Sequence, residues 1–214
     1  MNYDIVIFDF DGTIAETGRG ILRSAGYALE QMGKPVPPDD VLRRFVGPPL
    51  FDSFRNFCGL TESEAEQAIA HYRRRYSAVG LFEAEIYPGI PALLGDLRAA
   101  GAWVAVASGK PEAFLRRIID HFGLTACFDG VAGHDPDNRS ADKRAQILSV
   151  LPPNADPARA CMVGDRCFDI DAGRALGMHT VAVGYGYGSR EEFAASGADF
   201  VADTVADLRD HLLR

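Results

Sequence analysis

The sequence lacks several features that would place it in a specialised class of protein. Its 214 residues include only four cysteines and three lysines, and 30 acidic residues outnumber the 22 basic ones. The formal net charge of −8 argues against binding to nucleic-acid backbones or to anionic membranes, both of which need a basic surface. We therefore expect neither a nucleic-acid partner nor a membrane partner.

Long apolar runs and paired cysteines are also missing. No apolar run approaches the roughly 18 residues that a transmembrane helix needs. The start of the chain, Met1 to Asp4, has neither the basic residues nor the long apolar stretch of a secretory signal. Without a Cys-x-x-Cys pair, the cysteines are interpreted as free, buried thiols in a reducing cytoplasm. These cysteines are Cys58, Cys127, Cys161 and Cys167.

The composition that remains is that of an ordinary globular protein. Hydrophobic residues make up 47% of the chain and charged residues 24%. A chain of this length buries about 70% of its unfolded surface, so it needs no disulfide or structural metal to fold. We therefore expect an enzyme, a protein that binds a small ligand, or a protein that binds another protein.

Short apolar runs that end in glycine or aspartate alternate with helical patterns. The apolar runs cover residues 5–8, 103–107, 128–132, 160–163 and 180–183, and the helical patterns cover 88–100, 112–122, 142–151 and 168–176. This alternation predicts an α/β fold, with a Rossmann-like parallel sheet and helices on both faces. Ligands of such sheets bind at the carboxyl ends of the strands.

Residues 16–83 interrupt the alternation, because they contain helical patterns alone. These patterns cover 20–32, 38–45 and 61–76, and Thr61 with Glu64 has the spacing of a capping box. We predict an all-helical cap domain at 16–83, inserted into an α/β catalytic core formed by 1–15 and 84–214.

Aspartates follow two of the predicted strands. Asp9 and Asp11 lie two residues apart, so an extended chain would point both carboxylates toward one ligand. A divalent cation such as Mg²⁺ would relieve their mutual repulsion. Asp165 follows the strand at 160–163, and Asp169 comes four residues later, so a helix would place both on one face.

Two further positions have the chemistry of an anion site. Ser108 and Gly109 follow a third strand at the mouth of a helix, where a hydroxyl and backbone N–H groups bind anions. Lys143 lies near the start of another helix. The chain has 19 arginines and only three lysines, so arginine is its usual basic residue. A lysine at position 143, and another at Lys110, therefore favours the interpretation that a compact positive charge is needed there for function over that of an ordinary surface residue.

Taken in chain order, these residues resemble the four motifs of the haloacid dehalogenase superfamily. The motifs are DFDGT at 9–13, Ser108, Lys143 and GDRCFD at 164–169. The insertion resembles that superfamily's helical cap of the first type (C1). The sequences FVGPPL at 45–50 and YGYGS at 185–189 are similar to those of phosphoglycolate phosphatase-like and 5′-nucleotidase-like members.

The resemblance implies a role for each motif residue. Asp9 would be the nucleophile that forms an aspartyl-phosphate, and Asp11 would act first as general acid and then as general base. Mg²⁺ would be held by the Asp9 carboxylate, the Asp11 backbone carbonyl and Asp165, with Asp169 supporting these ligands. The phosphoryl oxygens would be bound by Ser108, the Gly109 amide and Lys143.

Comparison with sister branches narrows the expected activity to a phosphoric monoester hydrolase. The superfamily's dehalogenases lack the second aspartate, which is present here as Asp11. Phosphonate-hydrolysing relatives use a cap lysine, and the only one here, Lys34, lies between a helix end and a proline. A phosphomutase of the β-phosphoglucomutase type and a catalytically silent phosphate-binding relative stay open as alternatives.

The substrate is expected to be a small phosphorylated metabolite, with nucleoside 5′-monophosphates and phosphoglycolate as first candidates. The predicted cap has nine acidic and nine basic residues, so its net charge of zero does not indicate a second anionic group on the substrate. Arg44, Gly47 and Pro48 are the candidates for a substrate loop in the cap. A monomer and a dimer are both compatible with the sequence.

Overall fold

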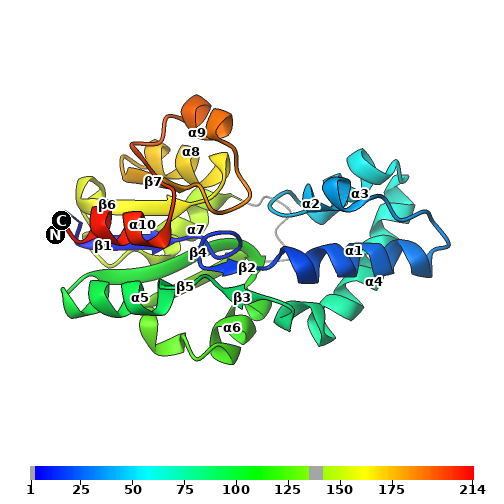
Figure 1. The fold of residues 1–214 in the computed structure, drawn as a ribbon, viewed down its shortest axis with the longest axis horizontal. Helices are drawn as coiled ribbons and strands as arrows, with labels where there is room; N and C mark the ends of the chain where they lie inside the picture. Colours follow the sequence, from blue (N-terminus) through cyan, green and yellow to red (C-terminus); the bar gives the residue numbers. More distant parts are fainter. Residues whose placement is uncertain (1–2, 135–141) are drawn as a thin grey trace. The chain divides into compact units, whose positions relative to one another are not determined.

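The computed structural model describes residues 3–134 and 142–214, and it divides into two compact units (Figure 1). The α/β unit comprises Met1–Glu16 and Ile86–Arg214, and the helical unit comprises Thr17–Glu85.

A six-stranded parallel sheet with the order β5-β4-β1-β6-β7-β8 forms the centre of the α/β unit. The strands are β1 (Ile5–Phe8), β4 (Trp103–Pro111), β5 (Gly130–His134), β6 (Ala160–Gly164), β7 (His179–Val183) and β8 (Phe200–Ala202). Phe8 at the end of β1 pairs with Val106 of β4 and Val163 of β6. The carboxyl ends of these three neighbouring strands therefore share one edge of the sheet.

Helices cover both faces of this sheet (Figure 1). They are α5 (Ile90–Ala99), α6 (Glu112–His121), α7 (Lys143–Val150), α8 (Cys167–Ala175), α9 (Arg190–Ser196) and α10 (Val205–Leu212), with short 3₁₀ turns at Thr125–Cys127 and Pro157–Arg159. α7 and α8 pack against each other, as do α5 and α10. The predicted α/β fold with a parallel sheet is confirmed.

The core explains why β1 is apolar at every position. Ile5 and Ile7 pack in one cluster with Ile147 of α7 and Ala172 of α8. Val6, which lies between Ile5 and Ile7 and points to the opposite face, is fully buried as well. A strand buried on both faces has no solvent-facing position for a polar side chain.

The helical unit contains α1 (Gly18–Gln31), α2 (Asp39–Arg43), α3 (Leu50–Cys58), α4 (Glu62–Ala78) and a 3₁₀ turn at Gly80–Phe82. α4 packs against both α1 and α3. It begins with the capping box expected from the sequence, because the Thr61 hydroxyl accepts from the Glu64 N–H at 3.3 Å and the Glu64 carboxylate accepts from the Thr61 N–H at 2.9 Å. Phe45 and Phe54 are buried with ring centroids 5.0 Å apart, so they form part of this unit's core.

Three features of the strands differ from the sequence expectation, and the first is β8, for which no strand was expected. β4 was expected to end at Ala107, but it continues to Pro111, because after an irregularity its pairing resumes between Pro111 and His134 of β5. The short strands β2 (Ala15–Glu16) and β3 (Glu85–Ile86), which pair with each other where the chain passes between the units, were not expected.

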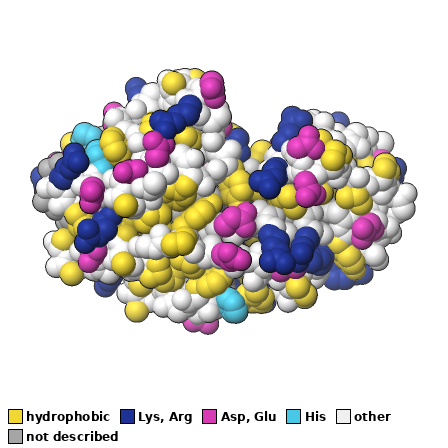
Figure 2. Space-filling model, viewed as in Figure 1, with side chains coloured by type: hydrophobic (Ala, Val, Ile, Leu, Met, Phe, Trp, Pro, Cys, Tyr) yellow, Lys and Arg dark blue, Asp and Glu magenta, His cyan; other side chains and the backbone are white. Residues whose placement is uncertain are grey.

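The surface of the α/β unit carries charges of both signs. Figure 2 shows acidic and basic side chains interspersed among apolar ones on one face of this unit. Exposed ion pairs such as Arg98–Asp129, at 2.7 Å, contribute less than about 1 kcal/mol each to stability. The four cysteines are free thiols, but only Cys161 is buried as expected, whereas Cys58, Cys127 and Cys167 are half-buried. Within the described ranges, no helix has both the length and the apolar character needed to cross a bilayer.

Candidate active site

Asp9 directly follows β1 and is held at the centre of the site. Its backbone N–H donates to the Val163 carbonyl of β6 at 2.8 Å, so the chain stays aligned with the sheet beyond Phe8. The residue is 8% exposed, and its Oδ1 accepts a hydrogen bond from Lys143 Nζ at 2.7 Å. Burial raises the pKa of Asp9 to about 6, although the Lys143 ammonium opposes this shift.

Asp165 and Asp169 approach the same point from β6 and α8. Asp165 follows Gly164 at the end of β6, is 1% exposed and accepts the Tyr187 N–H at 2.8 Å through Oδ2. Burial raises the pKa of Asp165, and the nearby carboxylates of Asp169 and Asp9 raise it further. Asp169 lies in the first turn of α8, where the helix dipole favours a negative charge, and its Oδ1 lies 2.6 Å from Lys143 Nζ.

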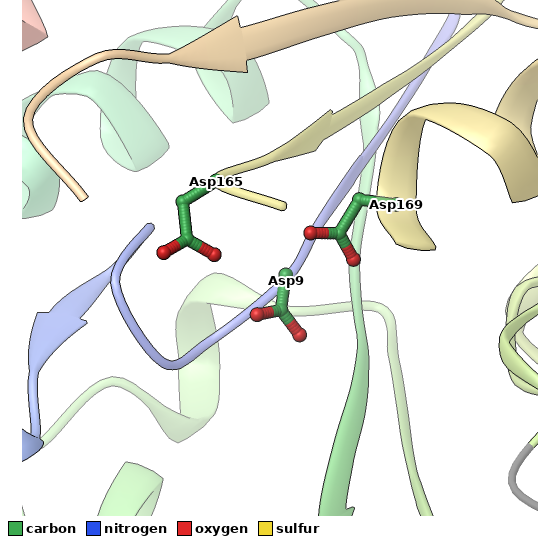
Figure 3. Close-up of side chains that lie close together, drawn as sticks. All are labelled: Asp9, Asp165 and Asp169. Carbon is green, nitrogen blue, oxygen red and sulfur yellow. The ribbon is translucent and has the colours of Figure 1, made fainter. Parts of the chain in front are cut away.

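The carboxylates of Asp9, Asp165 and Asp169 form one buried cluster (Figure 3). One oxygen from each residue lies within 4.8 Å of the others. Three carboxylates and the Lys143 ammonium together leave two negative charges, which a divalent cation would neutralise. An all-oxygen donor set of this kind is what Mg²⁺ and Ca²⁺ prefer. The residues present therefore fit a hard divalent metal ion.

Asp11 lies beside this cluster, and its side chain is engaged elsewhere. Its Oδ1 is 3.1 Å from Nζ of Lys110, a lysine whose side chain is only 4% exposed. The turn that directly follows Asp11 requires Gly12, because φ is +79° there and a Cβ atom would lie 2.1 Å from Asp165 Oδ2. The structure thus brings Asp9 into the cluster and directs the Asp11 carboxylate toward Lys110.

The extension of β4 sets the positions of Ser108, Gly109 and Lys110. Alternate residues of a strand point to the same side, and Ser108 and Lys110 are both buried whereas Gly109 is exposed. The Lys110 N–H donates to the Ser108 hydroxyl at 3.3 Å. A Cβ atom at Gly109 would meet no atom within 4 Å, so the fold alone does not require glycine there.

The predicted substrate-loop residues belong to the helical unit. Arg44 is exposed, and its guanidinium carbon lies 4.0 Å from the centroid of the Phe57 ring. Gly47 is also exposed and has φ of +104°, a conformation that favours glycine, and Pro48 is half-buried. The aromatic contact anchors Arg44 to the core of its own unit.

Sequence reasoning missed two contacts of the site. The contact of Lys110 with Asp11 was not anticipated, although the scarcity of lysine had singled out Lys110 as a candidate cation. The backbone N–H of Tyr187 on Asp165 was missed entirely. Its one trace in the sequence is the glycine at every second position of the Gly184–Gly188 segment.

The motif order and this geometry agree with a comparison against known protein families. The model of the haloacid dehalogenase-like hydrolases matches residues 6–183. The chain belongs to this family. That match covers most of β1 and all of β4, β6, α7 and α8, and it includes the motif residues Asp9, Asp11, Ser108, Lys143, Asp165 and Asp169.

Individual relatives within the family carry different names. The chain is 42% identical to the tyrosine-protein kinase PtkA of Mycobacterium tuberculosis over 213 residues, which cover 97% of this chain and 72% of that protein. It is 35% identical to a 5′-nucleotidase of Pseudomonas aeruginosa, covering 99% and 96% of the two chains. A crystal structure of a predicted phosphatase from Clostridium acetobutylicum matches with a TM-score of 0.90 at 35% identity, covering 99% and 98%.

Proposed function

We propose that the chain is a Mg²⁺-dependent phosphatase that hydrolyses small phosphomonoesters through an aspartyl-phosphate at Asp9. The observation that carries the proposal is the buried cluster of Asp9, Asp165 and Asp169 at the carboxyl ends of adjacent strands. Phosphatase-named relatives that span nearly the whole chain support the same class of reaction.

The reaction has two steps. A carboxylate oxygen of Asp9 attacks phosphorus, the bond to the ester oxygen breaks, and the departing alkoxide takes a proton from Asp11. A water molecule then gives a proton to Asp11 and attacks the same phosphorus, which releases phosphate and restores the Asp9 carboxylate. Bound between Asp9, the Asp11 carbonyl and Asp165, Mg²⁺ would supply the positive charge that lets an anionic nucleophile approach an anionic ester.

The other site residues bind and orient the phosphoryl group in this proposal. Its oxygens contact the Ser108 hydroxyl, the Gly109 N–H and the Lys143 ammonium, which stabilise the charge that the transition state spreads over them. Lys143 also orients Asp9, to which it donates at 2.7 Å. Asp169 supports the site by holding the same ammonium at 2.6 Å.

The two units have separate tasks in the proposal. The α/β unit is the catalytic core, and the helical unit is a cap whose loop at Arg44, Gly47 and Pro48 selects the substrate. Nucleoside 5′-monophosphates and phosphoglycolate, both present in the cytoplasm, are the substrates that we propose. Relatives named 5′-nucleotidase and phosphoglycolate phosphatase support this choice.

Substitution of the nucleophile tests the proposal. We expect Asp9→Asn to lower the hydrolysis of p-nitrophenyl phosphate in Mg²⁺ by at least about 1,000-fold, because the first step loses its attacking group. Asp171→Asn is the matched control, since Asp171 is an exposed aspartate near the same site, in α8. A wild-type protein that released no phosphate from any of a panel of phosphomonoesters, or an active Asp9→Asn variant, would contradict the proposal.

The 42% identity with a protein named tyrosine-protein kinase favours a second candidate, phosphoryl transfer to a tyrosine hydroxyl. The Asp9 carboxylate would then take the terminal phosphoryl group of ATP, with release of ADP, and pass it to a tyrosine phenol in place of water. Two assays distinguish the functions. On incubation with ATP, a kinase yields phosphotyrosine, whereas the phosphatase labels no tyrosine. On incubation with phosphomonoesters, the phosphatase releases inorganic phosphate.

A further inference from the structure

The loop between β7 and α9 wraps closely around Asp165. A Cβ atom at Gly186 would lie 2.4 Å from the Asp165 Cβ, and one at Gly188 would lie 2.0 Å from the Asp165 carbonyl oxygen. Neither position can carry a side chain without a shift of the backbone. The close fit brings the Tyr187 N–H to 2.8 Å from Asp165 Oδ2.

The side chain of Tyr187 is anchored at its far end. Its hydroxyl donates to Glu16 Oε1 at 2.7 Å, and Glu16 is the last residue of the α/β unit before the chain enters the helical unit. Tyr187 therefore contacts Asp165 through its backbone and β2 through its hydroxyl. A second tyrosine of the same loop, Tyr185, donates its hydroxyl to the Thr13 carbonyl at 3.1 Å.

We propose that Tyr187 is a positioning residue for the metal ligand Asp165, fixed in place by its bond to Glu16. The inference rests on the proposed function, because it takes Asp165 to be a ligand of Mg²⁺. A carboxylate can bind a metal ion through either oxygen and in several orientations. In Asp165, the Tyr187 N–H donates a hydrogen bond to Oδ2. The other oxygen, Oδ1, would then be the one that binds the metal ion together with Asp9. Groups that orient ligands in this way typically change metal affinity by about 10- to 100-fold when they are lost.

Mg²⁺ binding by the full-length protein tests this inference without reference to activity. Isothermal titration with MgCl₂ should show affinity reduced about 10-fold in Tyr187→Phe, which keeps the ring and loses the bond to Glu16. Glu16→Ala should give a similar loss, and the double variant should be no weaker than either single variant. In assays, Tyr187→Phe should need more Mg²⁺ for half-maximal rate yet approach the wild-type kcat at saturating Mg²⁺.

Tyr3→Phe is the matched control, because it also removes a tyrosine hydroxyl from a hydrogen bond within the α/β unit, here to His211. It should bind Mg²⁺ like the wild type. Wild-type affinity in both Tyr187→Phe and Glu16→Ala, with Mg²⁺ binding and hydrolysis intact in the wild type, would overturn this inference alone. Failure of the wild type to bind Mg²⁺ would overturn the proposed function together with it.

Discussion

Two lysines, one in each unit, show how burial changes what the same side chain can do. Lys143 in the α/β unit is 13% exposed and lies within 2.7 Å of two buried carboxylates. Lys34 in the helical unit is 36% exposed and pairs with Glu64, itself 30% exposed, at 2.5 Å. Water screens the second pair and is largely excluded from the first, so the charge of Lys143 interacts more strongly with its partners than that of Lys34 does.

In the proposed function, this difference in burial suits the α/β unit to the chemical step and the helical unit to the choice of substrate. The strong, buried charges at the sheet edge suit phosphoryl transfer from many esters, because every phosphomonoester presents the same phosphoryl group. The exposed residues of the helical unit can change at little cost in folding stability. This agrees with our proposal that the helical unit selects the substrate.

Removing the two lysines one at a time should have the largest and most different effects on the protein. Lys143→Met leaves Asp9 and Asp169 buried without their cation, so we expect a loss of about 3 kcal/mol in unfolding free energy. We also expect a loss of at least about 100-fold in kcat/KM, since a contact to the phosphoryl oxygens is removed.

Lys34→Met is the control for Lys143→Met. It should leave both the denaturant midpoint and the rate of hydrolysis close to those of the wild type. Urea unfolding and p-nitrophenyl phosphate assays measure the two effects. Equal destabilisation by the two substitutions would show that burial does not set the strength of these pairs.

The pH dependence of stability is the next largest expected effect. Burial raises the pKa of Asp9 from 3.8 to about 6, so between pH 4 and 6 the folded state keeps a proton that the unfolded state has lost. Stability contributed at this site is full below pH 4 and falls as pH rises, by about 3 kcal/mol at pH 7 for a shift of this size.

Comparison with Asp9→Asn in EDTA isolates this contribution from other groups. The variant should gain stability relative to the wild type as pH rises from 4 to 6, and Mg²⁺ should reverse much of the difference by stabilising the ionised carboxylates of the wild type. A difference between the two proteins that stayed constant across this range would contradict a raised pKa of Asp9.

The helices and strands that position the site were largely predictable from the sequence. β1 and β6 are continuous apolar runs because both of their faces are buried, and each ends at an aspartate of the cluster. Of the aspartates expected to act together, Asp9, Asp165 and Asp169 are brought together by the parallel pairing of these strands and by the first turn of α8. The Asp11 carboxylate, expected to point to the same ligand as Asp9, pairs with Lys110 instead. Hydrophobic pattern and strand order were sufficient for this part of the site.

Other features depend on contacts that leave little trace in a sequence. The residues Ser108 to Pro111 contain a glycine and a proline and have the pattern of a turn, yet pairing with β5 keeps them in β4. β8 has three residues, too few for a periodic pattern. The Tyr187 bond to Asp165 comes from a backbone N–H, which every residue except proline possesses.

The smallest expected effect concerns the helical unit. If this unit selects substrates, Arg44→Ala should raise KM about 5-fold for phosphoglycolate, whose carboxylate an exposed guanidinium can bind with about 1 kcal/mol. KM for p-nitrophenyl phosphate, which has no carboxylate, should stay the same, and kcat should change for neither substrate. Arg73→Ala, an exposed arginine of α4, is the control. Equal changes in KM for both substrates would assign Arg44 a structural role through its contact with Phe57. Another residue of the helical unit would then have to select the substrate.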